Sequence, residues 1–565
     1  MEVSAMEEAL PKKKTSKGGL RTIPFIISNE VFEKVATFGL HANMILYLTE
    51  RYHMTAATGT VVLYFWNAVS NFLPIFGAVL SDSCLGRFRV IALGSVISLV
   101  GMCLLCLTAI LPADRRTPDC AARRSECELV PWQLPLLFAS FLLMSIGSGG
   151  IRPCALAFGA DQLDRRDNSA RNVRTLQTFF NWYYTVLGLS IVFASTVIVY
   201  IQQAKGWVIG FAVPFVLMLT ALTLLLVGSP FYLKAEADRS VLVGLVQVLV
   251  ASYRNRRGPL PPETADASRF HNRAGYKPRT PSNRLRWLNR ACALGDNPDK
   301  EVNPDDGSAR DPWTLCTVQQ VEDVKAAVRV LPIWSTGIMP GVIIGQQMFP
   351  VLQAKTMERR VGGLEIPAAS FGVFSILTLT VWVAVYDRAL VRPLSRLTGH
   401  ARGVTLRQRM GIGLALFAVA MASGRAVRMS AMRLVPQHCI TGLAEALNLI
   451  GQIEFYYSEF PKTMSSIGVS LLALGMGFGS VAGSAIVGAI NAGTRSGGGD
   501  SWLSSNLNRG HYDYYYLVLA ALCVANLAYF VWCGWAYGEE GQNRVTAEEE
   551  AVEDTKTKED QQQKL

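Results

Sequence analysis

Charged residues are scarce in this chain. Only 17% of its 565 residues are Asp, Glu, Lys or Arg, and half are hydrophobic, whereas soluble domains carry about 25% charged residues. This scarcity argues against a series of soluble domains and favours a protein embedded in a lipid bilayer.

Sites for enzymatic or metal chemistry are also lacking. The six histidines are scattered, no CxxC pair occurs, and no nucleophile constellation falls on an apolar segment. We therefore expect no enzymatic activity, no metal and no cofactor. Most cysteines lie in apolar segments, where they behave as small hydrophobic residues. Only Cys120 and Cys127 share a polar loop, where they could form one disulfide outside the cytosol.

The start of the chain offers no cleavable signal peptide, because it stays polar up to about Ile23. The first apolar segment should therefore remain in the protein. The net charge of +11 comes from basic residues in the loops between apolar segments. We interpret this charge as a signal of membrane topology rather than of nucleic-acid binding.

Apolar runs recur along the chain at the length needed to cross a membrane, roughly 20 residues for a hydrocarbon core of about 30 Å. They predict an all-α membrane protein with two groups of six spans. The ninth span is short: its apolar part, Met410 to Ser423, reaches only about 21 Å at 1.5 Å per residue. The predicted order is a polar tail (1–22), six spans (23–233), a polar linker (234–322), six spans (323–536) and an acidic tail (537–565).

The basic clusters predict the orientation. They precede the first span and recur in 165–174, in the linker and in 388–409, which an even number of spans places on one side. Since cytoplasmic loops are enriched in Lys and Arg, we expect both tails and the linker to be cytoplasmic. A loop with four arginines within 115–124 falls on the other side and counts against this rule.

A short motif occurs at equivalent places in the two halves. Asp82, Gly86 and Arg87 follow the second span, and Asp387 and Arg388 follow the eighth. An acid and an arginine at helix ends can pair in one state of a carrier and separate in the other. We interpret these residues as a cytoplasmic gating motif, with an ordinary interfacial ion pair as the alternative.

Ionisable residues inside spans are costly and therefore indicate function. Glu30, Glu33 and Lys34 stand at i, i+3 and i+4, on one face of the first span. We expect Lys34 to pair with Glu30, which leaves Glu33 as the less compensated acid and the proton carrier. A static salt-bridge cluster is the alternative. His41 could relay protons or simply pack.

Further candidates lie in later spans. Arg152 is a lone arginine deep in the fourth span, and since arginine stays charged it needs a carboxylate or an anionic ligand. We expect it to alternate between the acids of the first span and the substrate, with a structural lock as the alternative. Glu445 is the candidate from the second half, and Gln346 and Gln347 are candidate donors. Glu454, nearer the cytoplasmic end, is expected to anchor its helix at the boundary.

At these residues the chain resembles the plant nitrate/peptide-transporter (NPF) family, within the proton-coupled oligopeptide transporter group of the major facilitator superfamily. The segment from Glu30 to Lys34 resembles the family's ExxE[KR] motif, and Arg152 falls where the family places a cation. Segments 159–162, 179–183 and 451–457 resemble other signatures, and the likeness extends over nearly all of 20–540.

The resemblance implies a major-facilitator fold whose two six-helix bundles rock about a central site. It implies import of solute together with protons as the coupling ion, but it does not identify the substrate; we expect small, mostly anionic solutes, such as nitrate or organic anions including plant hormones. The carrier would act as a monomer in the plasma membrane or, alternatively, the vacuolar membrane. Relatives have a longer ninth helix and loop, so this chain is shortened there.

Two departures bear on the substrate. Thr37 and Phe38 stand where peptide-carrying relatives place a tyrosine pair, which disfavours peptides. The region 343–346 lacks the histidine that nitrate-carrying relatives can use. The alternatives that remain are a pH-independent uniporter or receptor of the same fold and a di- or tripeptide symporter. A channel is disfavoured because no re-entrant pore segment is evident.

Overall fold

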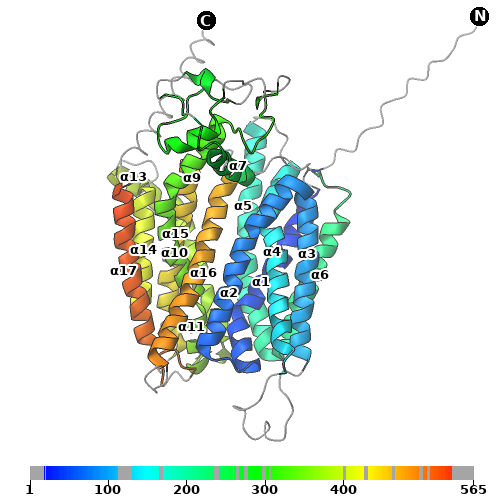
Figure 1. Cartoon of the computed structure of the whole chain (residues 1–565). Helices are drawn as coiled ribbons and strands as arrows, with labels where there is room; N and C mark the ends of the chain where they lie inside the picture. The colour runs from blue at the N-terminus through cyan, green and yellow to red at the C-terminus, as the bar shows by residue number, and fades with distance from the viewer. Residues whose placement is uncertain are drawn as a thin grey trace, which may run out of the picture.

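Long helices make up most of the chain and run side by side in two groups (Figure 1). The described parts of segment 241–317 cover one end of the helices, which we call the linker end; the opposite end is the far end. The computed structural model describes residues 18–19, 21–111, 130–163, 170–234, 241–258, 260–262, 266–272, 278–295, 301–303, 307–398, 403–424, 430–460, 465–495, 501–505 and 509–536.

The first group of helices forms the N-terminal bundle. The helix labelled α6 contains a turn at Gly206, where φ is 84°, so its first residues complete the fifth span and the rest form the sixth. Two π-helical turns, η1 (Ser81–Leu85) and η3 (Ala194–Ile198), extend α2 and join α5 to α6. The long helices are α1 (Ile23–Arg51), α2 (Ala56–Leu80), α3 (Arg87–Ile110), α4 (Gln133–Leu163), α5 (Ala170–Phe193) and α6 (Val199–Val227).

The second group forms the C-terminal bundle. Its first span is broken, with a bend of 41° after α9. A short antiparallel pair, β1 (Arg360–Val361) and β2 (Leu364–Glu365), leads to the next span. The elements are α9 (Val318–Thr336), α10 (Ile338–Gly345), α11 (Met348–Thr356), η6 (Ala368–Gly372), α12 (Val373–Val385), η7 (Tyr386–Leu390), α13 (Val391–Thr398), α14 (Leu406–Ala422), η8 (Ala431–Leu434), α15 (Val435–Glu459), α16 (Ser465–Arg495) and α17 (Tyr512–Ala536).

Many of these helices are suited to a membrane. Among the described residues, seven are long and apolar enough to cross it, or eight if the bent pair counts as one span. The remaining bundle helices include α1, which carries the buried charges, and α14, which has only 17 residues, about 25 Å. The predicted all-α fold of two bundles and the short ninth helix are confirmed.

Side-chain caps set where two helices begin at the linker end. Thr317 accepts a hydrogen bond from the backbone of Gln320, whose side chain accepts one from the Thr317 N–H in return. Thr405 and Gln408 form the same capping box at the start of α14. Each box satisfies backbone donors that a helix start leaves open. The cap places the start of α9 at Val318, inside the predicted linker.

Small residues bring helices of one bundle into backbone contact. Gly77 of α2 lies against the backbone of Gly149 in α4, and Gly94 of α3 lies against Gly147. A β-carbon at either α2 or α3 glycine would collide with the α4 backbone. Close approach through small residues is a common basis of helix packing in membranes.

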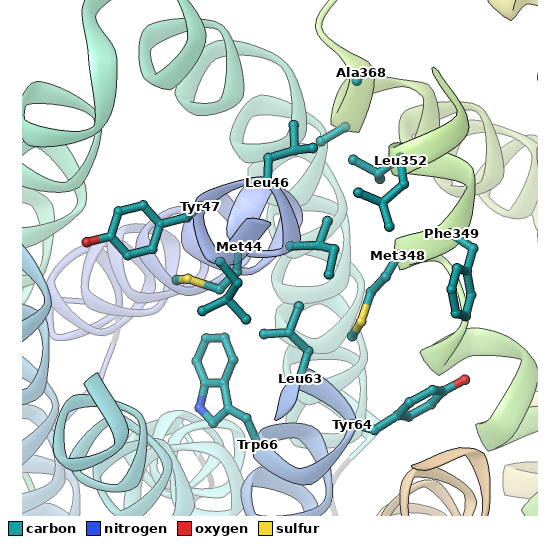
Figure 2. Close-up of a cluster of buried hydrophobic side chains, with 14 of the residues drawn as sticks. Met44, Leu46, Tyr47, Leu63, Tyr64, Trp66, Met348, Phe349, Leu352 and Ala368 are labelled. Atoms are coloured by element: carbon teal, nitrogen blue, oxygen red, sulfur yellow. The ribbon is translucent and has the colours of Figure 1, made fainter. Parts of the chain in front are cut away.

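The two bundles meet at the far end through apolar side chains. Figure 2 shows Met44, Leu46 and Leu63 of the N-terminal bundle beside Met348 and Leu352 of the C-terminal bundle. Burial of each such side chain stabilises by roughly 1.5–3 kcal/mol. The far end is therefore closed.

Tyr64 joins the bundles within this contact. Its hydroxyl donates to the carbonyl oxygen of Val342 in α10 at 2.9 Å. Its ring lies against Gly345 of α10 and Gly483 of α16, where a β-carbon would collide with it. At this point the contact between the bundles is thus an aromatic ring packed against two glycines.

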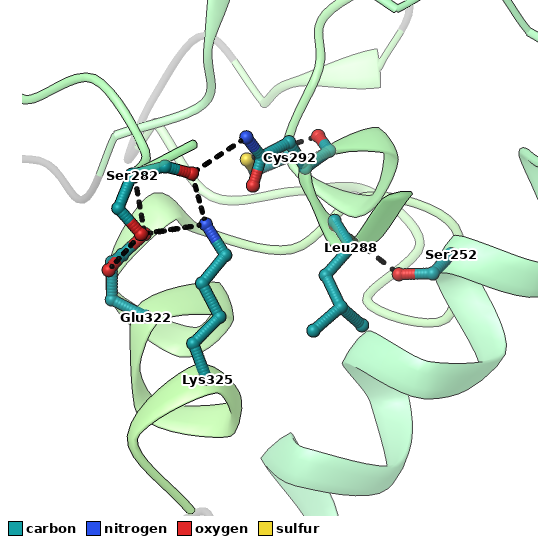
Figure 3. Close-up of polar contacts among 7 residues, drawn as sticks. Ser252, Ser282, Leu288, Cys292, Glu322 and Lys325 are labelled. Atoms are coloured by element: carbon teal, nitrogen blue, oxygen red, sulfur yellow. Dashed lines mark hydrogen bonds and ion pairs between the residues drawn. The ribbon is translucent and has the colours of Figure 1, made fainter. Parts of the chain in front are cut away.

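The linker is fixed to the start of α9. It contains α7 (Val241–Arg254) and the 3₁₀ turns η4 (Ala267–Arg269) and η5 (Arg286–Ala291). Figure 3 shows the polar contact: Lys325 donates to the Ser282 carbonyl at 2.7 Å and to Glu322 at 2.8 Å. The Ser282 N–H donates to Glu322 at 2.8 Å. These bonds hold segment 278–285 on the first helix of the C-terminal bundle.

Candidate functional site

The acidic motif lies on the inward face of α1, near the linker end. Glu30 and Glu33 are only 4% and 1% exposed. Lys34 Nζ lies 2.8 Å from Glu33 Oε2 and 3.2 Å from Glu30 Oε1. Glu33 Oε1 also accepts a hydrogen bond from Thr37 at 3.1 Å. Both acids therefore share one lysine.

The expected Glu30–Lys34 pair is confirmed, but the prediction that Glu33 is the less compensated acid is wrong. Both oxygens of Glu33 accept hydrogen bonds, whereas Glu30 Oε2 is buried with no hydrogen-bond partner among the described residues. The i+4 spacing alone favoured a Glu30–Lys34 pair, but the lysine side chain also reaches back to its neighbour Glu33. Glu30 is thus the less compensated acid.

Tyr183 of α5 adds a group that the sequence placed only in a signature segment. It is buried and close enough to Glu30 and Glu33 to interact with both carboxylates. The signal that could have identified it is its position in segment 179–183. A phenol beside two acids is a candidate hydrogen-bond donor to whichever of them is ionised.

Arg152 of α4 lies beside this cluster without being bound to it. It interacts electrostatically with Glu33, Lys34 and His41. It forms no hydrogen bond or ion pair with any residue that the structure describes. His41 packs on Trp66, with 4.8 Å between ring centroids. The half-buried guanidinium therefore has donors available for a solute.

The candidates of the C-terminal bundle lie on α15 and at the break between α10 and α11. Glu445 of α15 is half-buried and makes no hydrogen bond or ion pair within the described part of the chain. Gln346 and Gln347 form the break between α10 and α11. Gln346 is 1% exposed, and its Oε1 has no hydrogen-bond partner among the described residues. Within the described part of the chain no hydrogen bond or ion pair joins these residues to Arg152, so each bundle contributes its own polar groups.

The gating motif of the first half forms an ion-pair network at the linker end. Gly86, with φ at 78°, lets the chain turn from η1 into α3. Arg87 then lies 2.6 Å from Asp161 of α4 and 3.8 Å from Asp82. Asp161 is a partner that the sequence did not reveal. The network connects three successive helices.

A related pair occurs in the second half, between different residues from those predicted. Arg409, at the start of α14, binds Glu454 of α15 through two hydrogen bonds of 3.1 and 3.3 Å. Glu454 is therefore an ion-pair partner rather than only a boundary anchor. Asp387 lies on the π-helical turn η7, as Asp82 lies on η1, but its side chain is outside the described part; Arg388 is exposed.

The candidate disulfide and metal chemistry can be placed only in part. Cys120 and Cys127 lie outside the described residues. Among the residues that are described, no group of His, Cys, Asp and Glu is arranged to hold a metal ion.

Comparison with known proteins gives consistent matches. The family model PTR2, described as the POT family, matches residues 88–503. The Arabidopsis thaliana protein NRT1/ PTR FAMILY 1.2 is 45% identical over 564 residues, which cover 95% of this chain and 92% of that protein. NRT1/ PTR FAMILY 1.1 of the same plant is 45% identical over 558 residues, 94% of each.

Solved structures agree on the fold. The crystal structure of an auto-inhibited POT family peptide transporter matches with a TM-score of 0.67 at 19% identity, covering 92% of this chain and 97% of that one. The POT family transporter PepTSo matches with a TM-score of 0.65 at 18% identity, covering 92% and 98%. At this identity the likeness shows the fold alone.

Proposed function

Because this chain belongs to the POT family and is a membrane transporter of the NRT1/PTR type, we propose that it is a proton-coupled symporter of small, mostly anionic solutes. It imports them by alternating access, acting as a monomer in the plasma membrane, or alternatively in the vacuolar membrane. Under this proposal the linker end is cytoplasmic and the closed far end is the outer side.

One observation carries the proposal: Arg152 has no partner among the described residues, yet it lies beside the Glu30–Glu33–Lys34 cluster. An arginine inside a membrane span needs an anion. The carboxylates of the cluster are nearby, but Lys34 already compensates both of them. A solute anion can therefore compete with these carboxylates for the Arg152 guanidinium.

This arrangement couples proton and anion binding. When Arg152 approaches the acids, the positive charge favours their ionised forms and a proton leaves. When an anionic solute engages Arg152, the acids lose that compensation and one takes up a proton. Each ligand therefore favours the other, as linkage requires. The open oxygen of Glu30 makes it the first candidate to receive the proton.

The inter-bundle contacts support alternating access. The far end is sealed by the apolar cluster that includes Met44, Leu63 and Met348. At the linker end, the ion pairs of Arg87 with Asp161 and of Arg409 with Glu454 join helices within one bundle rather than across the bundles. The bundles can then separate at the linker end without breaking either pair.

A second candidate function rests on Glu445. This carboxylate also lacks a hydrogen bond or ion pair among the described residues. A free cation in one bundle and a free carboxylate in the other would suit a zwitterion, such as a di- or tripeptide. Thr37 and Phe38, in place of the tyrosine pair, count against peptides.

The test is uptake of a panel containing nitrate, organic anions and dipeptides by cells that express the chain, in acidic and neutral media. Anion uptake that acid stimulates and a protonophore removes supports the proposal. Dipeptide uptake with the same pH response supports the second candidate. Uptake indifferent to pH and protonophore indicates a uniporter and contradicts both.

A further inference from the structure

The linker helix α7 is apolar on nearly all sides although it is not one of the membrane spans. Between Val241 and Ala251 the only polar side chain is that of Gln247. A helix that is hydrophobic all round is normally covered all round. With 14 residues α7 is too short to cross a bilayer, so its cover must come from elsewhere.

One side of α7 is covered by the protein. Val248 and Ala251 are fully buried in the linker core. Leu245 contacts this core and also an apolar cluster to which α9, α14, α15, α16 and α17 contribute. The helix therefore lies directly on the linker end of the C-terminal bundle, as Figure 1 shows.

The other side of α7 is uncovered. Val246, Leu249 and Tyr253 are 50%, 46% and 66% exposed. Their spacing of three and four residues places them on one stripe of the helix. Covering this stripe with an apolar environment would be favourable by roughly 25 cal/mol per Å² of apolar surface removed from water.

Two arginines extend the stripe beyond its C-terminal end. The Arg256 guanidinium lies 4.2 Å from the centre of the Tyr253 ring, and Arg257 is exposed. Neither forms an ion pair with a residue that the structure describes. Arg254, in contrast, already pairs with Asp311 at 3.6 Å. The stripe thus combines apolar side chains with two available positive charges.

We propose that this stripe docks on anionic phospholipid headgroups at the linker side of the bilayer. Apolar residues on one face and basic residues beside them are the features of interfacial helices. The position on the span ends puts α7 at the level where headgroups lie. Val246, Leu249 and Tyr253 enter the interface, and Arg256 and Arg257 contact lipid phosphates. The proposal requires only the membrane location and not the proposed transport function.

Site-specific photo-crosslinking tests this docking. Leu249 is replaced by a photoreactive phenylalanine analogue, and the whole chain is placed in nanodiscs of phosphatidylcholine alone or mixed with phosphatidylserine. We expect lipid adducts at position 249 that increase with phosphatidylserine. Arg256→Gln and Arg257→Gln should each reduce them by about fivefold, because a basic residue near an anionic surface contributes about 1 kcal/mol.

Two controls make the result specific. The same analogue at Val381, a 60% exposed position in the α12 span, should give lipid adducts that do not depend on phosphatidylserine. Arg279→Gln, an exposed linker arginine outside α7, should leave the adducts at 249 unchanged. Adducts to the N-terminal bundle instead of lipid would show that protein covers the stripe and would overturn the proposal. Adducts insensitive to phosphatidylserine and to both α7 arginine variants would overturn it as well.

Discussion

Lys355, in the last turn of α11, lies 2.6 Å from Glu50, in the last turn of α1, and joins the two bundles at the far end. Both side chains are exposed, and exposed ion pairs contribute about 0.2–1 kcal/mol. The pair therefore stabilises the closed far end only weakly, and it can break during a transport cycle.

We predict that Lys355→Gln opens the far end more often. The ratio of closed to open molecules should fall by no more than about fivefold, in line with the energy of an exposed pair. Labelling of a cysteine introduced on the far-end surface measures the change. The charge swap Glu50→Lys with Lys355→Glu should restore the parental rate, and a swap that behaves like the single variants would contradict the pairing.

Arg152→Ala should abolish transport while membrane abundance stays near normal. Arg152 makes no hydrogen bond or ion pair with a described residue, so its removal should cost little stability. It is, however, the cation that is available to bind an anionic solute. Arg152→Lys should keep part of the activity, because the charge survives without the guanidinium geometry. Uptake and surface abundance are measured together; full transport by Arg152→Ala would make the residue merely structural.

Glu30→Gln and Glu33→Gln should both abolish solute accumulation driven by an inward proton gradient. Exchange of solute without a gradient should survive in Glu30→Gln, because the amide resembles the protonated form of the acid that is the first candidate to receive the proton. Glu33→Gln should be at least as harmful, since it removes the closer partner of Lys34. Uptake in acidic and neutral media, with a protonophore, provides the measurement.

A matched control for these variants exists on the same helix. Glu50→Gln changes an exposed glutamate at the other end of α1 and breaks its pair with Lys355; compared with Lys355→Gln, which breaks the same pair, it should leave the ratio of uptake in acidic to neutral media at the parental value. Acid-stimulated, protonophore-sensitive uptake that persists in both Glu30→Gln and Glu33→Gln would exclude the proposed coupling.

Lengthening α14 should raise the abundance or the transport activity of this chain. The helix has 17 residues, about 25 Å, against a hydrocarbon core of about 30 Å. Inserting about 20 residues of helix and loop after Ser423 should raise abundance or uptake because it removes hydrophobic mismatch. Quantitative immunoblotting and uptake assays decide, and unchanged values would mean that the short helix is tolerated.

The linker thiols Cys292 and Cys316 should resist alkylation while the protein is folded. Burial raises the pKa of each to about 12, whereas an ordinary thiol has a pKa of about 8.5. Both stay protonated at neutral pH, and thiolate is the reactive form. Mass spectrometry after maleimide treatment should find Cys84, which is exposed, labelled well before them.

The same thiols predict that the stability of the folded linker falls as the pH rises. Their folded-state pKa values lie above the unfolded value, so their contribution to stability is present below pH about 8.5 and is lost as the pH rises towards about 12. The linker should therefore become sensitive to protease in alkaline buffer. Equal labelling of Cys84 and Cys292 at neutral pH would contradict the buried environment.

The sequence predicted those features of the structure that depend on the spacing of neighbouring residues along the chain. Glu30, Glu33 and Lys34 share a helical face because their separations match the helix repeat, and the helical order followed from apolar runs. It did not predict the pair of Arg87 with Asp161, since those residues are 74 positions apart and meet only when α3 packs on α4. The roles assigned to these residues, and the predicted domain limits, stay predictions.

The error about the acidic motif has a different origin. Whether Glu30 or Glu33 keeps an open oxygen depends on the rotamer of Lys34 and on Thr37, not on the spacing of the acids. The exposed stripe of α7 could not be predicted either, because an apolar run such as 241–251 does not show which of its sides the rest of the linker covers.

The contact of Tyr64 with Gly345 and Gly483 has a mechanical consequence. Gly77 and Gly149 bring backbone against backbone inside one bundle, and such a joint opens only if helices move apart along their length. Between the bundles, the Tyr64 ring occupies the space that a side chain at Gly345 or Gly483 would need, and its hydroxyl bonds to the Val342 carbonyl. The helices of the N-terminal bundle therefore resist separation, whereas the Tyr64 contact between the bundles separates when one hydrogen bond breaks and one ring moves.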